Sequence, residues 1–310
     1  MKYISEDMVR DLLPPDRAIE VVEKAFADVS NGLIRTGVRG TLNVDPSGDD
    51  CIFLPAVHGS EAFYSLKCAA SFPSCAVKGL PTVQSQILIF SKETGTLAAI
   101  IEANWLTALK TGAASAVAAH HLAWADTGVL AVIGAGEQAK TQMQSLCRVR
   151  DIQEIRLADL DEDRCRDLRD WARDHVNPLP RISITTSSDD AVDGADIVVT
   201  CTTSGRPVFD GRRLKQGALV NAIGGFTPEM QEIDVHTVRS AGLIVADSKA
   251  AALEFAGDLV VPIRQGQFSE DPDIPELGDI VSGKANGRSG PDQIILYESV
   301  GFPPLDLAVG

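Results

Sequence analysis

The stretch from Gly128 to Asp159 limits the fold of this chain more than any other segment. An apolar run, Gly128-Val-Leu-Ala-Val-Ile133, leads into Gly134-Ala135-Gly136, and residues typical of a helix continue to about Cys147. A second run, Glu154-Ile-Arg-Leu-Ala158, ends at Asp159. The order strand, glycine turn, helix, strand and acid is that of a βαβ unit that binds a dinucleotide. We therefore predict a parallel sheet with a dinucleotide site at this turn.

The residue types in this unit suit the chemistry of that ligand. Gly134 can adopt the positive φ of a tight turn, and Gly136 lets the backbone approach a pyrophosphate. Glu137 and Gln138 begin the helix and would offer their backbone N–H groups. The Asp159 carboxylate can accept a hydrogen bond from a ribose 2′-hydroxyl and would repel a 2′-phosphate, which favours NAD while leaving NADP possible. A glycine-rich turn alone often serves only packing, but here the strand, the helix and the acid also occur at the expected spacing.

Composition excludes several classes of partner. The chain has 310 residues, of which 45% are hydrophobic, so it can bury a core and form two domains. Its net charge of −15 argues against nucleic acid and anionic membranes as partners. No apolar run approaches the roughly 20 residues of a membrane helix. The six cysteines form no CxxC pair and no signal peptide precedes them, so we expect a reduced cytoplasm. No metal site is predicted, since His120 and His121 have no further ligand at suitable spacing.

The periodicity changes along the chain. Residues 14–31 are predicted to form an amphipathic helix. Short β-type runs follow near residues 38–44, 51–57, 63–70, 85–90 and 97–101, with turns such as that at residues 45–48, and this half is typical of an antiparallel α+β unit. After an alanine-rich helix at 106–123, buried strands alternate with helices, with later strands near 182–186, 196–201, 218–223 and 243–247. This second pattern predicts a doubly wound parallel sheet.

Seven local sequences then resemble those of the ornithine cyclodeaminase and mu-crystallin family, in the family's order and over nearly the whole chain. They are Gly79-Leu-Pro-Thr-Val83, Glu93-Thr-Gly95, Leu106-Thr-Ala-Leu-Lys-Thr-Gly-Ala-Ala-Ser115, Ile133-Gly-Ala-Gly-Glu-Gln138, Gly224-Gly-Phe-Thr-Pro228, Gln231-Glu-Ile-Asp234 and Glu298-Ser-Val-Gly301. The resemblance implies a Rossmann domain, residues 119–291, inserted in an α+β substrate-binding and dimerisation domain, residues 1–118 plus 292–310. It also implies a homodimer.

The resemblance assigns roles to three cationic residues. Arg39 matches an arginine that clamps the substrate α-carboxylate, a task suited to a planar bidentate fork. Lys67, at the end of an apolar strand, matches the lysine beside the reacting carbon, and we expect it to be catalytic. Lys110 stands where most relatives have an arginine that touches the cofactor phosphates, and a lysine could neutralise them as a point charge.

Further cofactor contacts follow from the same resemblance. Thr202 follows a buried strand and is placed to line the nicotinamide ribose, although strand capping is nearly as good an explanation. Leu160 occupies a position where NADP-using relatives carry an arginine, which again favours NAD. Val300 is expected to close the pocket over the nicotinamide and substrate. The remaining residues assigned to the cofactor are Thr82, Ile223, Gly224, Gly225 and Ser299.

Phe226 decides which reaction is expected. True cyclodeaminases carry an aspartate at this position, whereas a phenylalanine would leave the δ-ammonium of ornithine without a counter-ion, at a cost of several kcal/mol. The chain is in this respect similar to mu-crystallin and to Δ1-pyrroline-2-carboxylate reductases. We therefore expect NAD(P)-dependent reduction of a small or cyclic α-imino acid, or the reverse oxidation of an L-amino acid. Two alternatives stay open, an ornithine cyclodeaminase in which another acid replaces the missing one, and a ligand carrier that binds NAD(P)H without turnover.

Overall fold

The computed structural model describes residues 1–45 and 48–310, and Pro46 and Ser47, in the predicted turn at residues 45–48, lie outside the described part. The chain divides into two compact units. The first comprises Met1–Lys110 and Phe302–Gly310, and the second comprises Thr111–Gly301. No helix in the described residues is both long and apolar enough to cross a bilayer.

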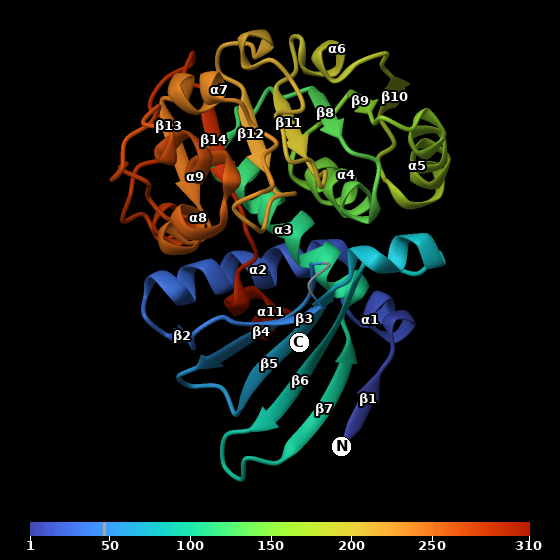
Figure 1. The fold of residues 1–310 in the computed structure, drawn as a ribbon, viewed down its shortest axis with the longest axis vertical. Coiled ribbons are helices and arrows are strands. Elements are labelled where there is room, and N and C mark those ends of the chain that lie inside the picture. Colours follow the sequence, from blue (N-terminus) through green and yellow to red (C-terminus); the bar gives the residue numbers. More distant parts are fainter. Residues whose placement is uncertain (46–47) are drawn as a thin grey trace. The chain divides into compact units, whose positions relative to one another are not determined.

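The first unit is built on a mostly antiparallel sheet (Figure 1). The strands run in the order β1-β7-β6-β5-β4-β2, and β3 also pairs with β4. β1 pairs with β7 in the parallel sense, which the predicted antiparallel unit did not include. The bounds are β1 Lys2–Ile4, β2 Ile34–Thr36, β3 Gly40–Asp45, β4 Asp49–His58, β5 Phe63–Ser71, β6 Val83–Ser91 and β7 Leu97–Glu102.

Two helices cover the buried face of this sheet. The predicted amphipathic helix is α2, Pro15–Ser30, which buries Ala18, Val22, Ala25 and Phe26. The Phe26 ring stacks on Phe302, 5.7 Å away between centroids, and so attaches α2 to α11, Pro303–Val309, at the carboxyl end of the chain. The other helices of this unit are α1, Glu6–Leu12, and the 3₁₀ turn Pro73–Lys78, and α3, Asn104–Leu122, begins here and ends in the second unit.

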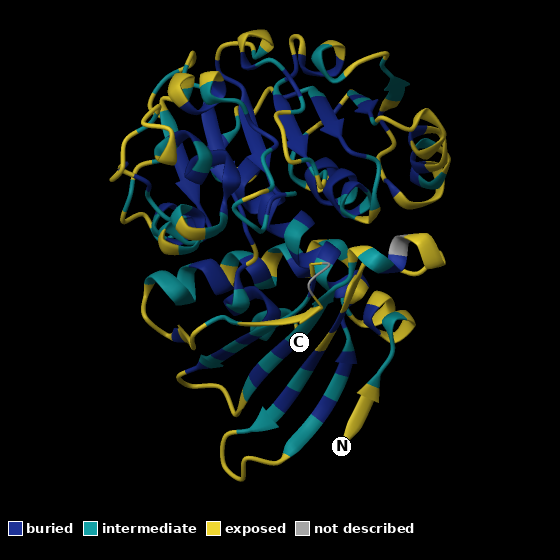
Figure 2. Ribbon diagram, in the orientation of Figure 1, coloured by how far each residue is buried: buried dark blue, intermediate teal, exposed yellow. Residues whose placement is uncertain are grey.

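The second unit is a seven-stranded parallel sheet in the order β10-β9-β8-β11-β12-β14-β13 (Figure 1). Its central strands are buried on both faces (Figure 2), which explains why they read as continuous apolar runs. The predicted doubly wound sheet is confirmed. The strands are β8 Val129–Ile133, β9 Glu154–Ala158, β10 Arg181–Ile184, β11 Ile197–Thr200, β12 Leu219–Ala222, β13 Leu243–Ala246 and β14 Ile295–Glu298. The helices are α4 Glu137–Val149, α5 Glu162–His175, α6 Ser188–Val192, α7 Val235–Ser240, α8 Lys249–Phe255, α9 Gly257–Arg264 and α10 Leu277–Val281.

β14 corrects the predicted domain boundary. We assigned residues 292–310 to the first domain, but Ile295–Glu298 pairs with β12 and β13 inside the second sheet. Only the segment from Phe302 onward belongs to the first unit. The strand has four buried residues and no alternation, so the sequence carries no signal that separates it from a loop.

The alanine-rich part of α3 allows the close contact that its composition predicted. A Cβ atom added to Gly112 would lie 2.5 Å from the Thr141 carbonyl oxygen of α4, so only glycine fits at this crossing. Ala113, Ala114 and Ala116 are also buried. Small side chains therefore bring the backbone of α3 against the helix that follows the glycine turn.

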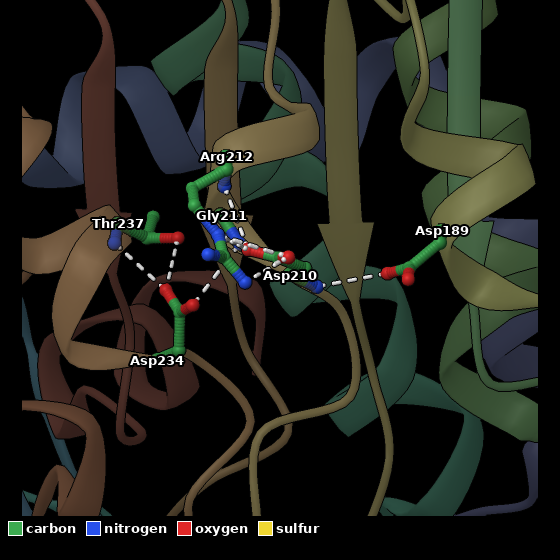
Figure 3. A network of polar contacts seen from close by, with 6 residues as sticks. All are labelled: Asp189, Asp210, Gly211, Arg212, Asp234 and Thr237. Carbon is green, nitrogen blue, oxygen red and sulfur yellow. Dashed lines mark hydrogen bonds and ion pairs between the residues drawn. The ribbon is translucent and has the colours of Figure 1, made fainter.

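A polar network fixes the connection between β11 and β12 (Figure 3). The Gly211 backbone N–H donates to Asp234 Oδ2 at 3.0 Å, while Oδ1 of the same carboxylate accepts from the Thr237 N–H in the first turn of α7. Arg212 holds the Asp210 carboxylate and lowers the pKa of that group to about 2. The Asp210 N–H in turn donates to Asp189 Oδ1 at 2.8 Å. These contacts attach the long connection to two helices of the same unit.

Candidate functional site

The glycine turn after β8 requires glycine at Gly134 for two reasons. Its φ of 99° lies in the left-handed region. A Cβ atom there would also lie 2.8 Å from the Cys201 carbonyl oxygen, closer than real Cβ contacts. The Gly134 N–H donates to the Ala158 carbonyl at 2.8 Å, so the turn is anchored to β9 on one side and abuts the end of β11 on the other.

The first turn of α4 presents backbone donors. Gly136 is the N-cap residue, with a φ of −89°, and no side chain accepts a hydrogen bond at this cap. A Cβ atom on Gly136 would meet nothing within 4 Å, so the backbone is open to an approaching group. The Glu137 carboxylate is exposed and pairs with Lys140 Nζ at 2.6 Å. A helix start with free N–H groups and a positive dipole end fits a pyrophosphate.

Asp159 connects the end of β9 to this turn. Its Oδ2 accepts from the Ala135 N–H at 2.7 Å, and its Oδ1 accepts from the Asp161 N–H at 2.9 Å. The carboxylate is therefore held in place by backbone donors, with lone pairs remaining for a ribose hydroxyl. Leu160 beside it is fully exposed. The residues present fit the adenosine side of a dinucleotide that lacks a 2′-phosphate.

Glu232, which sequence reasoning missed, ties together the loops after β11 and β12. Its buried carboxylate accepts from Thr200 Oγ1 at 3.0 Å, from the Thr202 N–H at 2.6 Å and from the Gly224 N–H at 2.8 Å. Burial raises the pKa of Glu232 despite these donors. A Cβ atom on Gly224 would lie 2.3 Å from the Thr202 carbonyl oxygen, which explains this glycine. The loops are thus fixed at the carboxyl ends of two adjacent parallel strands, where such sheets bind ligands.

Asp258 supports Glu232 from α9. Its Oδ1 accepts from the backbone N–H groups of Glu232 at 2.6 Å and Ile233 at 2.8 Å. Burial, with the nearby Glu232 carboxylate, raises the pKa of Asp258 to about 8. Burial and the Asp258 carboxylate likewise raise the pKa of Glu298. Burial therefore raises the pKa of all three acids.

The other residues predicted near the nicotinamide occupy varied surroundings. The Thr202 hydroxyl accepts from the Ser204 N–H at 3.1 Å, as a capping residue would. Ser299 Oγ donates to Asp247 Oδ2 at 2.8 Å and is buried, and Val300 packs in the hydrophobic core of the second unit. Ile223 is buried, while Gly225 and Phe226 follow in the loop after β12. Their predicted ligand contacts stay predictions.

The first unit contains a buried cluster of charges formed by Lys67 of β5, Lys110 of α3 and Asp306 of α11. Lys67 Nζ lies 3.1 Å from Asp306 Oδ1, and Lys110 Nζ lies 2.5 Å from Asp306 Oδ2. The exposed fraction is 4% for Lys67, 3% for Lys110 and 1% for Asp306. Lys67 lies in the middle of β5, not at its end as predicted, because the strand extends to Ser71.

Polar side chains hold Lys67 from the opposite side. Lys67 Nζ donates to Thr107 Oγ1 at 2.8 Å. The Thr107 hydroxyl donates its own hydrogen to the Ala103 carbonyl at 2.5 Å and lies 3.2 Å from Ser85 Oγ. Since a hydroxyl has one hydrogen, Thr107 can only accept from Lys67. Thr107 therefore fixes the direction of the Lys67 amino group in the cluster.

The charges of this cluster do not cancel. The three side chains together hold two ammonium groups and one carboxylate. Such a group of side chains attracts a small anion, and burial strengthens the attraction. The sequence indicated Lys67 and Lys110 but not Asp306, whose position in an apolar helical segment is the only local signal.

Arg39 and Thr82 lie in connections of the same unit. Arg39 is half-buried and precedes β3 directly. Thr82 is exposed and precedes β6, and its carbonyl accepts from the Phe72 N–H at 2.6 Å. The ammonium group of Lys110 contacts Asp306, a partner that the sequence analysis did not foresee. Its predicted contact with the cofactor phosphates stays a prediction.

The family model of ornithine cyclodeaminase and mu-crystallin matches residues 4–310. The chain belongs to this ornithine cyclodeaminase/mu-crystallin family. Among curated members, a Δ1-pyrroline-2-carboxylate reductase of Bacillus cereus is 34% identical over 310 residues, which cover 100% of this chain and 94% of the relative.

Two solved structures of the family share the whole fold. A Δ1-pyrroline-2-carboxylate reductase of Thermococcus litoralis in complex with NADH and L-proline superposes with a TM-score of 0.95, at 30% identity, covering 100% of this chain and 95% of the other. An archaeal alanine dehydrogenase dimer with bound NAD has a TM-score of 0.92, also at 30% identity, covering 100% and 93%. The resemblance seen in the sequence is confirmed.

The two glycines of the turn give a matched test. Gly134→Ala should lower the free energy of unfolding by about 1–3 kcal/mol, because a residue at positive φ would also contact Cys201. Gly136→Ala should lower it by less than about 1 kcal/mol, because its backbone is ordinary and its surroundings are open. Urea denaturation of the two variants measures the difference. Equal losses would contradict the geometry of the turn described above.

Proposed function

We propose that this protein is an NAD-dependent enzyme that reduces a small or cyclic α-imino acid, such as Δ1-pyrroline-2-carboxylate or Δ1-piperideine-2-carboxylate, and can catalyse the reverse oxidation. The observation that carries the proposal is the buried cluster of Lys67, Lys110 and Asp306, whose two ammonium groups suit the binding of a small anion. The substrate named for the Bacillus cereus relative carries such a carboxylate, and the Thermococcus litoralis structure holds its reduced counterpart, L-proline.

The strand register supports a role for Arg39 beside this cluster. Gly40 pairs with Phe53, and Leu54 pairs with Lys67. Continuing the antiparallel ladder by one residue puts Arg39 opposite Leu54, in the same row and on the same face as Lys67. Two strand spacings, about 10 Å between backbones, then separate the two cations, and long side chains can close on one carboxylate from both sides.

Lys67 would hold the substrate and assist the protonation that accompanies the reduction. Reduction of a C=N bond adds a hydride to carbon and leaves the bonding pair on nitrogen, which must carry a proton. The nicotinamide supplies the hydride when bound. A protonated Lys67, fixed by Thr107, would hold the substrate carboxylate and stabilise the charge that changes next to it. Burial of the cluster strengthens each of these contacts, since water does not screen them.

The dinucleotide proposed for this enzyme is NAD. Gly134 and the uncapped start of α4 form a cradle for the pyrophosphate, and Asp159 is held by two backbone donors in the position of a ribose ligand. Leu160 offers no charge to a 2′-phosphate. The solved relatives contain NADH or NAD.

A homodimer is proposed from the second face of the sheet in the first unit. Pro55, Leu66, Leu88 and Ile100 are partners in one row across β4, β5, β6 and β7, and all four are apolar yet only half-buried. Next to them Tyr64 stacks on Phe90 at 5.1 Å. An apolar sheet face of this extent favours association with a second copy.

The proposed location is the cytoplasm. All six cysteines are free thiols in the structure. Burial raises the pKa of Cys147 to about 12, which keeps its thiol protonated and unreactive. Free thiols in every position suit a reducing compartment.

Lys67→Met tests whether the protein is an enzyme or a carrier. The substitution keeps the length of the side chain and removes its charge, so NADH binding should survive while reduction of Δ1-pyrroline-2-carboxylate falls by about 10² or more. NADH oxidation is followed at fixed enzyme concentration, with ornithine as a parallel substrate. Phe226 predicts no proline from ornithine. Near-normal turnover by Lys67→Met would refute its catalytic role, and NADH binding without turnover of any imino acid by the parent would favour a carrier.

Cofactor choice tests Asp159. The parent should give the higher kcat/KM with NADH, since its carboxylate would repel a 2′-phosphate. Asp159→Asn keeps an oxygen acceptor for the Ala135 N–H, and combined with Leu160→Arg it should move the preference toward NADPH by about 1–3 kcal/mol. Leu160→Arg alone is the matched control and should move it less. Equal use of both cofactors by the parent would exclude the proposed role of Asp159.

The dimer proposal is tested on the apolar sheet face. Leu88→Lys puts a charge in the middle of the row and should convert the protein to a monomer, because a buried unpaired charge opposes association. Leu12→Lys, at an exposed apolar position of the same unit, is the control and should leave the mass unchanged. Light scattering after size-exclusion chromatography measures both. A parent that is already monomeric, or a Leu88→Lys variant that stays dimeric, would show that this face is not the interface.

A further inference from the structure

The carboxylate of Asp306 joins two cations that the reaction needs. We propose that Asp306 is a positioning residue for the proposed imino acid reduction, which keeps Lys67 and Lys110 charged and side by side as the receptor for the substrate carboxylate. The inference rests on the proposed function. It also means that α11, at the carboxyl end of the chain, completes the reactive part of the first unit.

The structure divides this carboxylate between two partners. One oxygen contacts Lys67 and the other contacts Lys110, and Asp306 itself is 1% exposed. Its helix is held by packing, because α11 contacts α2, β4 and β5, and Phe302 stacks on Phe26 of α2. The carboxylate therefore reaches the cluster from a packed element, and its charge acts at short range in a buried space.

The contacts leave Lys67 with hydrogens for a ligand. An ammonium group has three donors, and Lys67 gives one to Thr107. Its contact with Asp306 involves one oxygen, Oδ1, and takes at most one more donor. Asp306 thus supplies negative charge to Lys67 without occupying every donor. A substrate carboxylate can accept what remains.

Charge balance explains why an acid is required here. Without Asp306, two ammonium groups would share a buried space, and repulsion together with burial would favour loss of a proton. Of the elements packed on α11, β5 contributes Lys67 and α3 contributes Lys110. On α2 and β4, Asp28 and His58 lie 3.4 Å apart and face each other, and Arg35 of β2 is exposed. Asp306 is the anion that both lysines contact.

The test measures binding of pyrrole-2-carboxylate, a stable planar carboxylate, to the full protein with saturating NADH as a function of pH. Its carboxylate does not titrate between about pH 6 and 11, so the loss of binding at high pH reports lysine deprotonation, which in an ordinary lysine occurs near pH 10.4. For Asp306→Asn we expect this loss to move to lower pH by one unit or more. Asp306→Glu keeps the charge, so the pH at which this variant loses binding should be close to that of the parent.

Lys110→Gln should have the opposite effect. It removes the competing ammonium, so Asp306 pairs with Lys67 alone and the loss of binding moves to higher pH. This variant keeps the proposal testable if Asp306→Asn does not fold. Glu20→Gln removes an exposed carboxylate of α2 in the same unit and is the control, with no shift expected.

The outcomes separate the two proposals. If Asp306→Asn lowers affinity equally at every pH, or if Lys110→Gln leaves the loss of binding unmoved, Asp306 is only structural and the inference is overturned. Opposite shifts for the two variants support it. Failure of the parent to reduce any imino acid with NADH would overturn the proposed function, while opposite shifts in carboxylate binding would still assign Asp306 to the anion site.

Discussion

Burial of charge is the constraint on which the proposed anion site of the first unit depends. Lys67, Lys110 and Asp306 are almost inaccessible to water, and opposite charges in contact offset the cost of burying them. One carboxylate stands between two ammonium groups. The site proposed here uses that positive character to attract a substrate carboxylate. Hydrophobic residues of similar size would pack as well but could not recognise a carboxylate.

The second unit meets the same constraint with backbone donors. Glu232 and Asp258 are buried acids, and together they accept from five N–H or O–H groups in the loops and strand ends around them. These bonds do not fully offset burial, since the pKa of both groups is raised. In the glycine turn, by contrast, Asp159 is half-exposed. The acids that hold the loops in place and the acid expected to contact the ligand therefore differ in their access to water.

What the sequence predicted correctly was local in the chain. The glycine turn, α4 and Asp159 fall within one βαβ unit, where spacing along the chain sets the geometry. Most strands of both sheets were predicted from an alternating pattern or from a continuous apolar run. Glu232, Asp306 and β14 depend on pairing between segments far apart in sequence. The residues near Asp306 in the sequence do not indicate that its carboxylate pairs with two lysines. The four buried residues of β14 do not indicate which strands they pair with. The family resemblance identified Lys67, but the sequence placed it at the end of a strand and not in the middle of β5.

A chain with a net charge of −15 that is proposed to bind both an anionic dinucleotide and a carboxylate must create its affinity locally. Exposed charges are screened over about 8 Å at physiological ionic strength, so the acidic surface has little influence on a buried anion site. The positive potential comes instead from the two buried lysines in the first unit and from the helix start after Gly136 in the second. Because these two sources of positive potential are fixed by backbone and packing, they do not depend on the charge of the rest of the chain. Net charge accordingly argues against large anionic partners such as nucleic acid, but it does not argue against small anionic ligands.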